Sequence, residues 1–135
     1  MRARKGMTIV ELLVVMGIVG ILTVIAVVIY TSQIRQGRRS DGMDSLMAMS
    51  LAEEEYRTNN VLYGTLAQVW GGVTTSSRGY YTLSISNISG TSYTLTATAT
   101  GDQANDVSGS TACNSLQFAV SSGTVTKSPT VCWPQ

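Results

Sequence analysis

An uninterrupted apolar stretch near the start of the chain limits most strongly what this sequence can fold into. The stretch runs for 24 residues, from Met7 to Tyr30, and contains one charged residue, Glu11. As a helix it would be about 36 Å long at about 1.5 Å per residue, enough to cross a hydrocarbon core of about 30 Å. A carboxylate in such a helix costs about 2.5–3.5 kcal/mol on insertion scales, so Glu11 is a candidate functional residue.

The residues before this stretch differ from an ordinary secretory signal. A signal peptide places its small-residue cleavage site after the apolar region. Here the small residue, Gly6, comes first, directly after a basic leader that holds Arg2, Arg4 and Lys5. Cleavage after Gly6 would remove these charges, keep the apolar helix and leave a new amino terminus one helical turn from Glu11. The alternative is an uncleaved membrane anchor in which the glutamate is incidental.

The segment from Lys5 to Leu12, KGMTIVEL, resembles the leader and processing site of the type IV pilin family. This family covers type IV pili, the pseudopilins of type II secretion and competence pilins. The resemblance implies that a prepilin peptidase cleaves after Gly6 and methylates the amino group of Met7. It also implies that Glu11 pairs with the amino terminus of the same or a neighbouring subunit during assembly. Most members carry Phe where this chain carries Met7.

The resemblance further implies partners and a location. The partners would be other pilin subunits, which form a helix bundle in the filament core, the prepilin peptidase and an inner-membrane assembly platform. Before assembly the helix would lie in inner-membrane lipid, with the C-terminal domain in the periplasm. After assembly the chain would belong to a pilus filament at the cell surface. No cofactor is implied.

The helix is expected to continue beyond the apolar stretch. Many pilins have a proline near the position of Val28, whereas this chain has none before residue 129. A continuous helix to about Arg57 is therefore predicted. Its second half, residues 31–60, is amphipathic, with an apolar period that we expect to cover a sheet. The residues of this period are Ile34, Met43, Leu46, Met47, Ser50 and Leu51, and Met49 is expected to pack against the sheet with Met43 and Met47.

Residues 61–135 are rich in Ser, Thr and Gly and show strand-like alternation. Four strands are predicted, at residues 79–86, 92–100, 116–121 and 124–127, joined by tight turns. A four-stranded antiparallel sheet has to bury one face, and the amphipathic half of the helix is the available cover. The predicted fold is therefore α+β, the pilin fold. Its predicted parts are a leader (1–6), a membrane and filament-core helix (7–30), an amphipathic helix (31–60) and a globular domain (61–135).

Two cysteines, Cys113 and Cys132, lie in the part of the chain that we place outside the cytoplasm. Two thiolates in a chain without histidine do not complete a zinc site, and the Cys-x-x-Cys spacing of redox pairs is absent. We expect a structural disulfide, which is worth about 3 kcal/mol for a loop of about 20 residues. It also resembles the C-terminal disulfide-bounded loop of type IV pilins. No metal site is predicted.

Three arginines, Arg35, Arg38 and Arg39, follow the apolar stretch. Lipid phosphates, DNA or acidic residues of another subunit are possible partners. The plainer interpretation is a solvated helix face with local ion pairs to Asp41 and Asp44, and this is the one that we expect.

Further along the chain, Asp102 and Asp106 lie in a loop of small polar residues. Major pseudopilins bind calcium in an acidic C-terminal loop, but two carboxylates fall short of the 6–8 oxygen ligands that calcium takes. We expect a solvated turn.

The residue types exclude several functions. The chain has no histidine and no Gly-rich phosphate loop, so we predict no enzymatic activity. Cleavage after Gly6 removes three of nine basic residues and changes the formal charge from +1 to −2. DNA affinity depends on Lys and Arg at phosphates, so nucleic acid is a less expected partner. A local stripe that includes Arg78 and Lys127 is the arrangement in which DNA would bind.

The predicted function is therefore that of a structural subunit of a type IV pilus. The short length and compact C-terminal region favour a minor pilin, which is processed and then incorporated into a filament or primes its assembly. Such a filament serves motility, adhesion or DNA uptake. The alternatives are a pseudopilin of type II secretion and a DNA-binding minor pilin of competence.

Overall fold

One helix, α1, runs without interruption from Ile9 to Asn59 in the computed structural model, which describes residues 6–134. This confirms the prediction of a continuous helix, although α1 begins two residues after Met7. The basic residues of the predicted leader, within 1–5, lie outside the described residues. The chain divides into two compact units, Met1–Ile34 and Arg35–Gln135, so that α1 contributes to both.

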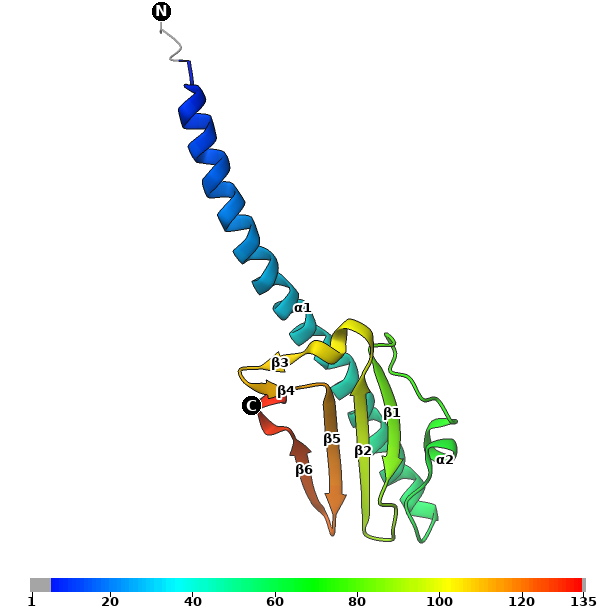
Figure 1. Ribbon diagram of the computed structural model, residues 1–135. Helices are drawn as coiled ribbons and strands as arrows, with labels where there is room; N and C mark the ends of the chain where they lie inside the picture. Colours follow the sequence, from blue (N-terminus) through cyan, green and yellow to red (C-terminus); the bar gives the residue numbers. More distant parts are fainter. Residues whose placement is uncertain (1–5, 135) are drawn as a thin grey trace, which may run out of the picture. The chain divides into compact units, whose positions relative to one another are not determined.

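The second unit is built on the predicted antiparallel sheet. Its strand order is β1-β2-β5-β6, and all neighbouring strands are antiparallel. The four strands are β1 (Tyr81–Ser86), β2 (Ser92–Ala99), β5 (Ser115–Ser121) and β6 (Thr124–Ser128). With the C-terminal part of α1 across one face of this sheet (Figure 1), the predicted α+β fold is confirmed.

Short elements connect the larger ones, and none of them was predicted. Each has two to five residues, too few to show a recognisable apolar period. They are α2 (Leu66–Trp70), the 3-10 helix η1 (Gly101–Asn105), β3 (Val107–Ser108), β4 (Thr111–Ala112) and the 3-10 helix η2 (Thr130–Cys132). The strands β3 and β4 pair with each other as a separate two-stranded ribbon.

The core lies between the C-terminal part of α1 and the sheet. Alternate strand residues point into it, among them Leu83, Leu95 and Leu116, each no more than 2% exposed. The helix approaches closely at Gly42, where a Cβ atom would lie 3.0 Å from the ring of buried Tyr81. A glycine at this position therefore lets the helix pack against the first strand.

Two apolar residues of α1 do not cover the sheet as predicted. Met43 and Met49 are buried, whereas Met47 is 39% and Leu51 73% exposed. The reason is geometric, because the buried face follows a narrow i+3/i+4 track through Leu46 and the other two side chains fall beside it.

The opposite face of the sheet carries hydroxyl groups. The side chains of Thr82 and Ser84 on β1 are exposed, and they lie opposite Thr98 and Thr96 of β2 in the ladder. The seven carboxylates beyond residue 34 lie on α1 or between residues 102 and 106. The outer face of the sheet therefore carries no acidic side chain.

One carboxylate of α1, that of Glu53, is fully buried. Its Oε2 accepts a hydrogen bond from the backbone N–H of Gly64 at 2.7 Å, while Oε1 has no partner among the described residues. Burial raises the pKa of Glu53, the bond from Gly64 opposes this, and nearby Glu54 raises the pKa further. Glu53 thus fastens the segment after α1 to the helix, at the expense of a desolvated carboxyl group.

This raised pKa predicts a pH dependence of stability. Because the folded state holds the proton more tightly than the unfolded state, the stability that Glu53 contributes should rise as pH falls from its raised pKa towards the ordinary value of 4.5. Glu53→Gln mimics the protonated form and should remove this rise. Thermal unfolding of both proteins at several pH values above 4.5 measures the difference. Parallel pH profiles for the two proteins would contradict the prediction.

Candidate functional site

The start of α1 brings together the three residues predicted to act in processing and assembly. Gly6 and Met7 are exposed and precede the helix. Glu11 lies in its first turn, and its backbone N–H donates to Oγ1 of Thr8 at 3.2 Å. Thr8 therefore caps the helix, which the sequence analysis missed although Thr-x-x-Glu is a capping signature. Cleavage after Gly6 would act on chain outside regular secondary structure, just before a capped helix.

The first unit presents an apolar surface. Every residue from 6 to 27 is exposed, including large side chains such as Ile9, Met16 and Leu22. By length and composition alone, α1 is long and apolar enough to cross a membrane. An apolar helix with no cover of its own has to be covered by lipid or by other helices.

The three arginines do not form the predicted local pairs with Asp41 and Asp44. Arg35 instead binds Asp102 through two hydrogen bonds, of 3.1 and 2.7 Å, and Arg38 lies 3.8 Å from the same carboxylate. Hydrogen bonding to Arg35 lowers the pKa of Asp102. The guanidinium of Arg38 also lies over the ring of Tyr80, 4.6 Å from its centre. The contacts with Asp102 join α1 to η1, which is distant in sequence.

The third arginine, Arg39, is buried. Its Nε and Nη2 donate to the two carboxylate oxygens of Asp106, and Nη2 also donates to the carbonyl of Val107 at 2.9 Å. The side chains are 6% and 2% exposed, so Asp106 is not part of the solvated turn that was predicted. Gln103 lies beside this pair, with Nε2 3.3 Å from Asp106 and 2.9 Å from the carbonyl of Arg35. Asp102 and Asp106 are therefore neutralised by arginines of α1.

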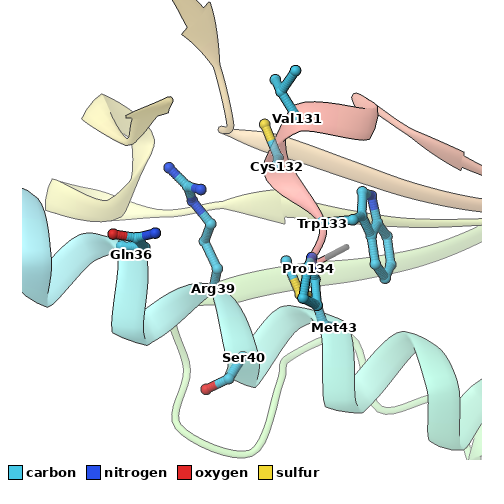
Figure 2. A pocket seen from close by; sticks show the side chains of 8 residues that line it. All are labelled: Gln36, Arg39, Ser40, Met43, Val131, Cys132, Trp133 and Pro134. Atoms are coloured by element: carbon cyan, nitrogen blue, oxygen red, sulfur yellow. The ribbon is translucent and has the colours of Figure 1, made fainter. Parts of the chain in front are cut away.

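The predicted disulfide joins Cys113 and Cys132, both of which are buried. It fixes the C-terminal segment beside α1. A hollow of about 260 Å³ lies between the two, lined by Arg39, Met43 and Trp133 among others. In Figure 2 the guanidinium of Arg39 points away from α1 towards the segment of Cys132, whereas Trp133 and Pro134 lie nearer Met43. The described residues contain no group of three or more His, Cys, Asp or Glu side chains that could hold a metal ion.

Arg78 and Lys127 are the two cations of the folded unit that contact no carboxylate, carbonyl or hydroxyl group among residues 6–134. Arg78 is exposed in the loop before β1. Lys127 lies on β6, with Nζ 5.1 Å from the ring centre of Trp133 and 5.9 Å from that of Phe118. Because β1 and β6 are the two edges of the sheet, the two cations lie at opposite edges rather than side by side.

Two family profiles match the chain. The family described as type IV minor pilin ComP, DNA uptake sequence receptor, matches residues 29–117, about two thirds of the chain. The prokaryotic N-terminal methylation motif matches residues 1–27. Comparison with curated proteins gives no match. The first match covers the second half of α1, the Arg78 loop, β1, β2 and the first residues of β5, and it ends before Lys127.

Proposed function

The chain belongs to the family of type IV minor pilins described as ComP, DNA uptake sequence receptor, and we propose that its folded unit binds DNA for the pilus. The observation that carries this proposal is the extent of the match. A methylation motif alone indicates a prepilin leader, but the minor pilin profile extends through most of the folded unit. DNA binding is therefore the proposed activity of that unit, although the sequence alone favours a purely structural role.

The charges of the folded unit support a small DNA contact. Six basic and seven acidic side chains lie beyond residue 34. Arg35, Arg38 and Arg39 are occupied by carboxylates, and Arg57 donates to the backbone carbonyls of Gly90 and Asn60. Arg78 and Lys127 remain, and of these two Lys127 is paired with the buried Phe118 and points to the core face of the sheet. One phosphate contact, made by Arg78, corresponds to a slope of about −1 in a plot of log affinity against log salt.

The outer face of the sheet supports the same proposal. It is rich in hydroxyl groups and free of carboxylates, and hydroxyl groups commonly donate to DNA phosphates. The exposed Arg78 lies at the β1 edge of this sheet, inside the region that matches the family. We propose that DNA docks on this side, with Arg78 as its cationic contact. Lys127 lies opposite the buried Phe118 in the ladder, so its side chain belongs to the other face of the sheet.

A salt titration tests this proposal. The processed full chain in detergent would be mixed with a random pool of labelled DNA duplexes, and the bound duplexes recovered. Arg78→Ala should weaken binding to a recovered duplex and make the salt slope shallower by about 1, whereas Arg78→Lys should keep the slope. Fluorescence anisotropy measures both quantities. Failure of the wild-type chain to enrich any duplex, or an unchanged slope for Arg78→Ala, would contradict the proposal.

Processing and assembly complete the proposed function. We propose that the peptidase cleaves between Gly6 and Met7, that Met7 becomes methylated and that Glu11 then pairs with the new ammonium group. Residues 7–30 would lie in inner-membrane lipid, with the folded unit in the periplasm, until the assembly platform transfers the subunit to a filament at the cell surface. The helix capped by Thr8, with an acid in its first turn, supports this arrangement.

The pseudopilin alternative has less support. A major pseudopilin would bind calcium in its acidic C-terminal loop, whereas here both carboxylates of that loop are engaged by arginines of α1. The minor pilin profile also covers this loop.

A further inference from the structure

We propose that Asp41 of α1 is a positioning residue for DNA binding, because it holds the loop before β1 in the conformation that presents Arg78. This inference rests on the proposed function and names a residue that does not itself touch DNA. Asp41 is 5% exposed, so it is out of reach of a bound duplex. It acts through the loop that it binds.

Both carboxylate oxygens of Asp41 are used to hold this loop. Oδ2 accepts a hydrogen bond from the hydroxyl of Ser76 at 2.5 Å, and Oδ1 accepts one from the backbone N–H of Arg78 at 3.0 Å. One carboxylate therefore holds the loop at two residues, Ser76 and Arg78, and the side chain of Arg78 faces solvent. Both residues are thereby attached to the same helix, α1.

Ser76 passes this restraint on to the strand. It is also 5% exposed, and its Oγ accepts a hydrogen bond from the N–H of Tyr81 at 3.0 Å. Its backbone N–H donates to the carbonyl of Tyr81, and its carbonyl accepts from Gly79. Gly79 has a φ of 77°, a conformation that glycine adopts without strain. The turn that carries Arg78 is therefore hydrogen-bonded to Tyr81 at the start of β1 on one side and to Asp41 of α1 on the other.

The charge of Asp41 is the second indication. Asp106, the other buried aspartate, is paired with Arg39, whereas Asp41 has no cation within salt-bridge distance among the described residues. An unpaired buried carboxylate is costly unless hydrogen bonds compensate. Here both compensating bonds run to the loop rather than to the core. The carboxylate of Asp41 therefore holds Arg78 in position.

The hydrogen bonds to Asp41 should hold the Arg78 loop in its binding conformation before DNA arrives. Ordering a mobile side chain or loop on binding weakens affinity by about 0.5–1.5 kcal/mol per group. Asp41→Ala should free the loop and weaken binding up to about tenfold. Asp44→Ala is a matched control, because it removes the same charge from the same helix at an exposed position. It should leave binding unchanged or slightly tighter, since a negative charge has gone.

A double-mutant cycle tests the proposal in the full chain. If Asp41 acts through Arg78, then Asp41→Ala should have no further effect on DNA affinity once Arg78→Ala is present. A purely structural role would weaken both backgrounds equally. Hydrogen exchange of residues 73–80 should become faster in Asp41→Ala. Asp41→Asn, which keeps one acceptor and gains a donor, serves if the alanine variant does not fold, and it should show the same non-additivity with a smaller effect.

The outcomes separate this inference from the proposed function. Additive effects of Asp41→Ala and Arg78→Ala, or wild-type affinity in a folded Asp41 variant, would overturn the positioning role while DNA binding by Arg78 stood. If the wild-type chain enriches no duplex from the random pool, the proposed function fails and the inference fails with it.

Discussion

Replacing Asp106 with leucine should lower the free energy of unfolding by about 3–5 kcal/mol, because it leaves the Arg39 guanidinium buried without its carboxylate. The Arg39 side chain is 6% exposed, and the carbonyl of Val107 is its remaining acceptor. Chemical denaturation followed by tryptophan fluorescence measures the loss. Trp133 is a suitable reporter, since it is 5% exposed and lines the same hollow as Arg39.

The neighbouring ion pair provides a control for this experiment. Asp102→Leu breaks the pair with Arg35. Its two partners are 67 residues apart in the chain, as Arg39 and Asp106 are, but this pair is exposed to solvent. Exposed ion pairs are weakened by solvent and by salt, so this change should have a much smaller effect. A comparable loss in both variants would show that burial is not the deciding factor.

The double variant Arg39→Met/Asp106→Leu is a second test of the same prediction. A buried ion pair replaced by apolar side chains of similar volume often leaves stability unchanged or improves it. The double variant should therefore recover most of the stability that Asp106→Leu loses. Wild-type stability in the single variant would contradict the prediction, and so would a double variant less stable than the single one.

The regular parts of this fold could be predicted from the sequence. Long runs with a clear period give elements that begin and end within two residues of those observed, and within one residue for β2 and β5. The disulfide was also predictable, because two cysteines in a chain without histidine and without Cys-x-x-Cys spacing have few alternatives. The segment between α1 and β1 was not, since α2 has five residues and is held by a capping box at Thr65 rather than by an apolar period.

The arginine cluster shows why site geometry was harder to predict. Local spacing offers Asp41 and Asp44 as partners, but Asp41 is turned to the loop of Ser76 and Asp44 is exposed. The actual partners lie 67 residues away, where η1 returns to the helix. A short 3-10 helix has no sequence signature strong enough to place two carboxylates against α1. The tertiary fold therefore decides which acids neutralise which arginines.

The exposed apolar residues of α1 were also hard to predict, because the tertiary fold decides which of them are buried. A helical period identifies a face, but how much of that face is buried depends on the width of the sheet beneath it. Met47 and Leu51 belong to the apolar period and still lie in solvent. In a subunit of a filament, such side chains are available to neighbouring subunits.

Replacing Glu11 with valine should reduce incorporation into the pilus by two to three orders of magnitude or more, while membrane insertion stays intact. The loss of one partner of a buried ion pair costs about 3–5 kcal/mol, and about 1.4 kcal/mol corresponds to a factor of ten. Insertion should not suffer, because valine removes the cost of a carboxylate in lipid. Immunoblots of sheared filaments measure incorporation, and mass spectrometry of the membrane fraction reports whether cleavage after Gly6 still occurs.

Two further variants separate ion pairing from helix capping at this position. Glu11→Gln keeps the length of the side chain and loses its charge, so it should fail to assemble as Glu11→Val does. Thr8→Val keeps the charge but removes the Oγ1 that accepts the Glu11 N–H, and loss of such a cap costs about 1 kcal/mol. It should therefore assemble nearly as well as the wild type. Normal incorporation of Glu11→Gln would mean that the carboxylate acts in some way other than by pairing with the ammonium group of a processed subunit.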